Sequence, residues 1–575
     1  MTSNTAVPDP SSAAYSTPTK RAVISASAEA GPSRARPAGA SPAYSSRRHS
    51  LYGIEDRVII DPGSRIWRVG FSGEPDPRAV YWTQRSPDTE GSEAWTLDLA
   101  QLHGCREDRK EAERLISARC VRLARDAFTK HLMTDAKTRK VVVLENTFLP
   151  TVVKEQIAAA LFDNLKVPSI SFTPSCLLAL AACGRITGLV VDIGWLETTI
   201  TPVYCSRPLD HLARSTTLAG KALHDRLRLL LQHHATYIPP PASMSNLERR
   251  PVQPVPEGLL SDRLLERILT EGCFVGSINL RTPNMSFADT SDDADDNRLA
   301  NMLRDRYRGS ATATDLSFRI DPPESTGLGP GLLLVPGWIR ERAAELLFGD
   351  DIDDEQDGIP ESILHCISKL PVDLRPTLIS SLLITGGTAS LPGLIPRLRV
   401  SLLRLLLPSP SLPETGHPIN SPAWRRAERA EWRKRHTEPF RSLYGLSGRL
   451  AILNDPAPLD TGDIDGGGLA GGRAPRWTPG LLSWVGGSLA GALKTGAPEM
   501  TRETYDTLFA HSIERGESWL AAQETAERDV AALVGVNIED LKPGMAREGG
   551  LERKRGWKVG GEGIIGDWTR VVRAG

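Results

Sequence analysis

Residues 58–73 read VIIDPGSRIWRVGFSG. The β-branched apolar run before Asp61 predicts a buried strand, and residues 61–64 form a turn signal because they combine Asp, Pro and Gly. A second run follows at residues 66–71, so we expect a hairpin. The same order of strand, Asp-x-Gly and extended segment returns at residues 189–200, which read LVVDIGWLETTI. This internal repetition predicts two related halves.

The repeated turns suit phosphate binding. A tight turn without bulky side chains leaves backbone N–H groups pointing into a concavity that accepts anionic oxygens. Asp61 and Asp192, one from each turn, can hold a hydrated divalent metal if they face each other. A third segment, LLITGGT at residues 382–388, places Gly386 and Gly387 between a strand and a helix. There a ribosyl or planar group can approach the backbone closely.

Strands alternate with helices along the chain, which predicts the α/β class. Apolar positions recur at helical spacing in several segments, and short pure apolar runs indicate buried strands. The expected helices lie at residues 106–133, 153–162, 176–182 and 394–407, and the expected further strands at 140–144, 168–172, 189–191 and 382–384.

Composition excludes several classes of protein. A length of 575 residues allows two to four domain-sized units. Lys and Arg total 69 against 70 Asp and Glu, so no overall charge favours nucleic acid. Seven cysteines without a CxxC pair predict neither a disulfide framework nor a structural zinc. The apolar stretch at residues 481–493 is too short for a membrane span. Residues 1–50 are rich in Ser, Ala and Pro and predict a disordered tail.

Several short blocks together resemble the actin family, within the wider group that includes sugar kinases and heat-shock ATPases. They stand in the family's order and span most of residues 56–510. The blocks are residues 60–64, 70–73, 77–80, 184–188, 191–194, 218–221, 385–388, 391–393 and 484–488.

The resemblance implies an actin-like α/β fold, with two lobes around a nucleotide cleft. The first lobe is expected at residues 51–205 and the second at 206–510, with insertions at 283–331 and 408–476 and a C-terminal extension at 511–575. Within the second insertion, residues 421–436 predict a basic helix, which either binds a partner or is a solvated insertion whose two Trp pack on its own domain.

The resemblance also implies ATP or ADP with Mg²⁺ as ligands. Asp61 and Asp192 would face the metal. Gly63, Ser64 and Gly194 would contact the phosphates, and Arg68 would reach them as the basic residue. The backbone of Gly386, Gly387 and Thr388 would lie against the nucleotide.

Departures from the family pattern argue against hydrolysis. Arg65 stands where the first loop keeps a second glycine, and Trp195 and Leu196 replace an acidic residue and a glycine in the second loop. The positions of the Gln and His that orient the attacking water hold Ser175 and Thr199. We therefore expect a degenerate ATPase site without catalytic residues. The alternative, that Asp61 and Asp192 only cap turns, stays open.

The connection between Arg78 and Val141 is shorter than in a filament-forming actin and holds no match to the loop that inserts into the next subunit. Segments at residues 131–143, 167–175, 335–341 and 370–375 are similar to the divergent actin-related subfamily at the pointed end of the dynactin filament. This implies a cytoplasmic, cytoskeletal cap whose partners are actin-like filament subunits and other pointed-end proteins, with nucleic acid not expected. Two alternatives are a nuclear actin-related subunit of a chromatin remodeller and an active ATPase of the same fold.

Overall fold

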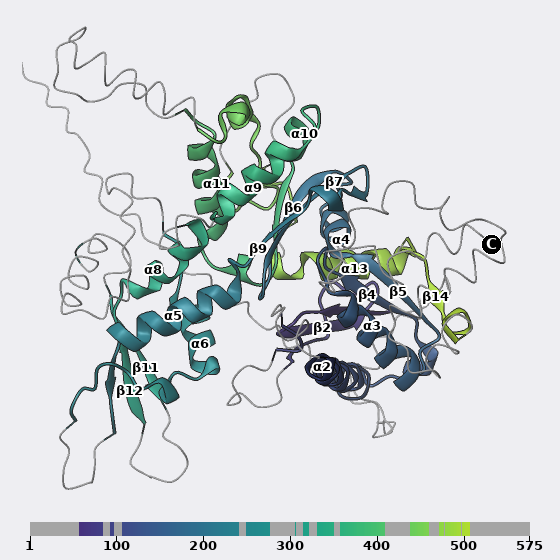
Figure 1. Cartoon of the computed structure of the whole chain (residues 1–575), viewed down its shortest axis with the longest axis horizontal. Coiled ribbons are helices and arrows are strands. Elements are labelled where there is room, and N and C mark those ends of the chain that lie inside the picture. Colours follow the sequence, from purple (N-terminus) through teal and green to yellow (C-terminus); the bar gives the residue numbers. More distant parts are fainter. Residues whose placement is uncertain are drawn as a thin grey trace, which may run out of the picture. The chain divides into compact units, whose positions relative to one another are not determined.

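The computed structural model describes residues 57–83, 93–96, 106–240, 249–276, 305, 314–320, 330–349, 357–408, 438–458, 471–475, 478–495 and 497–506 (Figure 1). The predicted tail at residues 1–50, the basic helix at 421–436 and the extension at 511–575 lie outside these residues.

The first sheet contains the predicted hairpin. Its strands β1 and β2 pair antiparallel, while β4 and β5 continue the sheet in parallel with β1. All five residues of β4 are buried, as expected of a central parallel strand covered on both faces. The order is β14-β5-β4-β1-β2-β3, with β1 at Val58–Pro62, β2 at Ile66–Phe71, β3 at Ala79–Trp82, β4 at Val141–Glu145, β5 at Ser169–Pro174 and β14 at Met500–Thr501.

The second sheet repeats this plan. Strands β6 and β7 form an antiparallel hairpin, and β13 pairs parallel to β6. A parallel bridge from Leu382 to Ile452 takes the place that β5 holds in the first sheet. The predicted repetition of strand, turn and strand is therefore confirmed. The strands are β6 at Gly188–Ile193, β7 at Thr198–Tyr204, β8 at Arg207–Pro208, β9 at Arg214–Thr216 and β13 at Leu382–Thr385.

Helices cover one face of the first sheet. Helix α2 supplies Cys120 and Leu123 to this core, and α3 supplies Val153 and Ile157. Each helix is followed directly by a π-helical turn. Helix α2 and its turn together form one long helical segment within the helix predicted at residues 106–133. The bounds are α2 at Arg106–Asp126 with η2 at Ala127–His131, η3 at Ala136–Thr138, and α3 at Thr151–Ala159 with η4 at Ala160–Asn164.

Two helices rich in small residues lie between the sheets: α4 at Ser175–Ala182 and α13 at Leu482–Leu493 (Figure 1). Their shared core includes Ile59 of the first sheet and Val190 of the second. A Cβ atom on Gly486 would lie 1.8 Å from the carbonyl oxygen of Leu178. Only glycine at this position lets α13 approach the backbone of α4 so closely.

The second sheet packs with the rest of the chain in the second lobe, whose core includes Leu189, Val191 and Ile200 and whose third sheet has the order β10-β12-β11. The predicted boundary puts residues 188–204 in the first lobe, but they pack in the second. Its helices are α5 at Gly220–His234, α6 at Asp262–Gly272, α8 at Ile339–Glu345, α9 at Ile359–Lys369, α10 at Arg375–Ile379 and α11 at Leu394–Leu405. Its strands are β10 at Thr236–Ile238, β11 at Leu316–Ile320 and β12 at Gly331–Val335. Short 3₁₀ turns are η5 at Asp210–Leu212, η6 at Glu257–Leu259, η8 at Leu346–Phe348, η9 at Thr388–Ser390, η10 at Arg441–Arg449 and η11 at Pro479–Leu481.

Two stretches expected to be insertions contribute to this lobe. The acidic composition of residues 283–331 indicates a solvated loop, but that interpretation is wrong for Leu316–Ile320, which is strand β11 and buries Phe318 against the lobe. The aspartates earlier in the stretch hid its apolar alternation. Within residues 408–476, Phe440, Leu443 and Ile452 belong to the core of the second lobe. No helix in the described part of the chain is both long and apolar enough to cross a membrane.

The packing of α13 on α4 gives a direct test. Replacing Gly486→Ala forces a methyl group against the Leu178 backbone, and backbone cannot swing aside as a side chain can. We expect a loss of about 2 kcal/mol in the free energy of unfolding, despite the roughly 1 kcal/mol that alanine gains in helix propensity. Denaturation by urea measures it.

The matched control is Gly258→Ala, because nothing lies within 4 Å of the added Cβ there. Its effect should stay within about 0.5 kcal/mol. Equal stabilities for the two variants would contradict the described helix packing.

Candidate functional site

Two equivalent hairpin turns form the centre of the site. The backbone N–H of Gly63 donates to the carbonyl of Ile66, and that of Gly194 to the carbonyl of Glu197, each at 3.1 Å. A Cβ on either glycine would lie within 3 Å of the same carbonyl oxygen. Each turn therefore closes on two tip residues, which are Ser64-Arg65 in the first turn and Trp195-Leu196 in the second.

The first turn is fixed from outside by the chain that follows β3. The hydroxyl of Thr83 donates to the carbonyl of Ser64 at 3.0 Å, and the N–H of Ala94 donates to the same oxygen at 2.7 Å. Ser64 itself is buried. The tip of this turn is thus held in one position before any ligand enters.

Arg68 pairs with Asp61 and also acts electrostatically on Asp192. Arg68 Nη1 donates to Asp61 Oδ2 at 2.9 Å. Burial and the negative charge of Asp61 raise the pKa of Asp192, Arg68 opposes them, and the pKa is about 6 as a result. Two carboxylates beside one cation leave a local excess of negative charge, which a divalent cation would neutralise.

These residues suit a Mg²⁺ ion that is also bound by phosphate oxygens better than they suit a metal ion whose ligands all come from the protein. Among the residues that the structure describes, no three His, Cys, Asp or Glu gather at one point. Mg²⁺ is commonly bound through one or two carboxylates, with water and substrate phosphates completing its shell. Asp61 and Asp192 can supply that pair.

The third glycine segment lies directly against the second turn. Strand β13 pairs with β6 so that Thr385 is opposite Asp192. Gly386 has φ +101°, and a Cβ there would lie 2.2 Å from the carbonyl oxygen of Ile193. The hydroxyl of Thr388 donates to the carbonyl of Gly194 at 2.8 Å. Glycine is required at 386 both by its conformation and by this close approach.

All nine predicted site residues line one cavity of about 500 Å³. Cavities of this size accommodate ligands as large as a nucleotide. The structure thus brings together every residue that the sequence singled out, and binding of a ligand by them stays a prediction. The nine are Asp61, Gly63, Ser64, Arg68, Asp192, Gly194, Gly386, Gly387 and Thr388.

The positions expected to orient water hold short side chains. Ser175 lines the cavity, and the hydroxyl of buried Thr199 donates to Asn146 Oδ1 at 3.4 Å. Glu197, which the sequence analysis did not identify, also lines the cavity, and burial raises its pKa to about 7. Its side chain is hydrogen bonded to Ser215.

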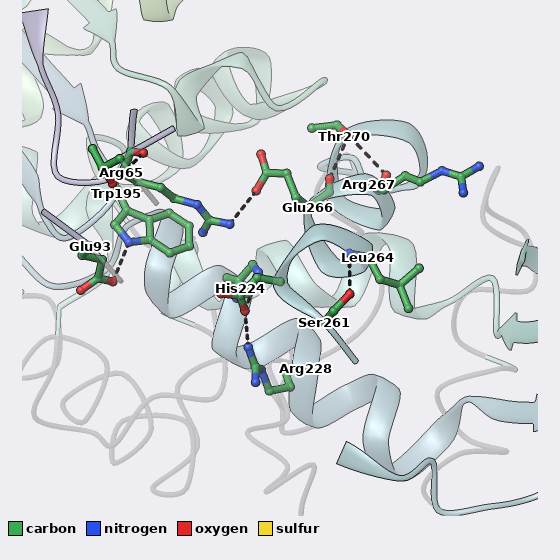
Figure 2. Close-up of polar contacts among 12 residues, drawn as sticks. Arg65, Glu93, Trp195, His224, Arg228, Ser261, Leu264, Glu266, Arg267 and Thr270 are labelled. Atoms are coloured by element: carbon green, nitrogen blue, oxygen red, sulfur yellow. Dashed lines mark hydrogen bonds and ion pairs between the residues drawn. The ribbon is translucent and has the colours of Figure 1, made fainter. Parts of the chain in front are cut away.

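The unusual tip residues Arg65 and Trp195 contact each other (Figure 2). The Arg65 guanidinium carbon lies 3.6 Å from the centre of the Trp195 ring, and Arg65 Nη2 lies 3.3 Å from Glu266 Oε2. The Trp195 indole N–H donates to Glu93 Oε1 at 2.8 Å. The sequence marked Arg65 and Trp195 as separate departures, but nothing in it pointed to Glu93 or Glu266.

His224 lies beside this contact. It is 2% exposed, its ring meets that of Trp195 edge-on, and its Nε2 lies 4.0 Å from Asp262 Oδ1. Burial and the positive charges of Arg65 and Arg228 lower the pKa of His224, Asp262 opposes them, and the pKa is about 4 as a result.

This shift predicts a loss of stability in acid. The folded protein holds His224 neutral while the unfolded chain takes up a proton below its ordinary pKa, so stability falls as the pH drops from about 6.5 towards 4. Between pH 7 and pH 5 the contribution is ~2 kcal/mol. Urea denaturation of the wild type and His224→Phe at both pH values measures it. Equal pH dependence in the two proteins would contradict the buried, neutral histidine.

Comparison with known proteins agrees with this geometry. The actin family model matches residues 55–262 and 331–420, which is more than half of the chain. Actin-related protein 4 from Arabidopsis thaliana is 26% identical over 61% of this chain and 86% of its own length. Actin-related protein 10 from Dictyostelium discoideum is 24% identical over 78% of this chain and 85% of its own.

A third relative, the SWI/SNF and RSC complexes subunit arp42 from Schizosaccharomyces pombe, is 23% identical over 60% of this chain and 84% of its own length. The family match extends over both hairpin turns and the Gly386-Gly387 segment, whose residues line one cavity. On this evidence the chain belongs to the actin family, and its relatives are actin-related proteins.

Proposed function

We propose that this protein is a structural, non-hydrolysing actin-related subunit that caps the pointed end of the dynactin actin-like filament. The observation that carries the first half of the proposal is the contact between Arg65 and Trp195 at the tips of the two turns. Hydrolysis of a nucleotide between these turns needs an ordered water and a group that orients it. A cation stacked on an indole ring supplies neither.

The same cavity supports binding of ATP or ADP with Mg²⁺. Asp61 and Asp192 would hold the cation, Arg68 would face the phosphates, and the glycines at 386 and 387 would let the nucleoside lie against backbone. The metal would neutralise phosphate charge and so fix the ligand. The chain's own residues would position and shield it without moving a proton.

The capping role is supported by the connection between β3 and α2. Residues 83–105 form it, and its described part, residues 93–96, is bound back onto the cleft. Ala94 N–H donates to the Ser64 carbonyl, and Arg119 Nη1 donates to the Glu93 carbonyl at 2.7 Å. Residues 93–96 are therefore held on their own subunit and are poorly suited to reach into a neighbouring one.

The dynactin assignment is supported by short sequence segments, and the actin-related character of the chain by its relatives. Residues 335–341 and 370–375 resemble the pointed-end subfamily, and the Dictyostelium relative aligns over 78% of this chain. Such a subunit would act in the cytoplasm, with other pointed-end proteins and actin-like filament subunits as partners. A second candidate, a nuclear subunit of a chromatin-remodelling complex, is favoured by the name of the Schizosaccharomyces relative.

Nucleotide content tests the first half of the proposal. We expect denaturing release from the purified native protein to yield about one ADP or ATP per chain, with no turnover above that of a protein-free control. Chelation of divalent cations with EDTA should release it, and Asp192→Asn should weaken binding about tenfold or more because the cation loses a ligand. Sustained phosphate release would establish the alternative of an active ATPase.

Affinity purification of the full chain from its source cells tests the second half. We expect dynactin pointed-end and filament subunits to co-purify at constant ratio through gel filtration. Recovery of chromatin-remodelling subunits instead, with DNA binding that weakens steeply with salt, would establish the nuclear candidate.

A further inference from the structure

Four contacts connect Arg65 and Glu93, on the first turn and beside it, with Trp195 on the second turn and with helices α5 and α6 of the second lobe. Arg65 stacks on Trp195, Arg65 also pairs with Glu266 on α6, and Glu93 binds both Trp195 and Lys221. Figure 2 shows the Arg65 side chain extended past the Trp195 ring towards Glu266, with Glu93 at the other side of the indole. We call these five residues the inter-lobe latch.

The charges of the latch balance. Two cations, Arg65 and Lys221, face two carboxylates, and every hydrogen-bonded or paired distance lies between 2.8 and 3.3 Å. Two of the ionic side chains, Arg65 and Glu93, are 13% and 14% exposed. Their partners Glu266 and Lys221 are 31% and 45% exposed, so each pair is shielded on one side and is screened by salt less than a fully exposed pair.

The guanidinium group lies close to two indole rings. Besides the Trp195 ring at 3.6 Å, the Trp82 ring of strand β3 lies 5.0 Å from the Arg65 guanidinium carbon. A planar guanidinium can stack on aromatic rings while its edge N–H groups bind a carboxylate, which a lysine ammonium cannot do in the same way. Arg65 thus makes its two inter-lobe contacts at once.

We infer that the latch holds the cleft closed by side-chain contacts alone, so that closure of the two lobes does not depend on a bound nucleotide. Trp195 and Arg65 connect the two hairpin turns directly. Lys221 extends the connection to the start of α5, and Glu266 extends it to α6. The inference goes beyond the capping role, because it concerns what keeps the subunit in one shape whichever complex it joins.

Hydrogen exchange of the full-length protein tests the latch. The protein is stripped of nucleotide with EDTA and a nucleotidase, and exchange is followed by mass spectrometry in peptides that cover Lys221 and Glu266, which are latch residues outside the predicted phosphate contacts. For the wild type we expect rates within twofold with and without MgATP or MgADP. For Arg65→Ala without nucleotide we expect rates at least tenfold faster.

Two milder variants keep the test decisive if Arg65→Ala folds poorly. Arg65→Lys keeps the charge opposite Glu266 and loses the stacking, and Glu266→Gln keeps the size and loses the charge, so each should accelerate exchange by an intermediate factor. The matched control is Arg267→Ala, the next residue of α6, whose exposed side chain pairs with Glu271 on its own helix. It should exchange like the wild type.

The latch would be overturned if the stripped wild type exchanged as fast as Arg65→Ala and slowed only with MgATP or MgADP. It would also be overturned if Arg267→Ala matched the latch variants. Neither result depends on turnover or on co-purification, so failure of the latch and failure of the proposed function are distinguishable.

Discussion

The close packing of α13 on α4 is the constraint on which the rest of the molecule depends. Both helices lie in a core that includes residues of the first and second sheets, and Gly486 is the point where their backbones come together. Because one pair of helices serves both sheets, the hairpin turns at their strand ends are brought to opposite sides of the same cavity. The site is a consequence of this shared core and of the repeated strand order.

The cavity combines a retained part and an altered part. Asp61, Arg68 and Asp192 keep a charge arrangement that suits a metal and phosphates, and Gly386 keeps the close approach of backbone. The tips of the turns have changed from small and polar to a stacked cation and indole. Retained binding residues beside altered tips fit the proposal that this site would hold a nucleotide without hydrolysing it.

Much of the fold and the positions of the nine site residues could be predicted from sequence. The β-branched runs before Asp61 and Asp192 and the repeated Asp-x-Gly turns contain the signal locally, which is why both hairpins are confirmed. Strand β11 escaped prediction because the aspartates before it dominated the composition. The pairing of Met500 with β5 joins residues more than 300 positions apart, and no local pattern indicates such a contact.

The latch shows the same limit within the site. Arg65 and Trp195 were recognised as departures one at a time, but only the fold places them in contact. Glu93 and Glu266 carry no motif, since a single glutamate on a helix or in a connection is usually solvated. Their roles follow from distance alone.

The central claim is that side chains of this protein hold its two lobes together. A pair of spin labels tests it most directly, one at exposed Lys137 in the first lobe and one at exposed Arg263 in the second, in a background where reactive cysteines such as exposed Cys205 are replaced by serine. The account predicts one narrow distance distribution that is the same in the nucleotide-free protein and with MgATP. A broad or longer distribution that narrows only when MgATP is added would contradict it.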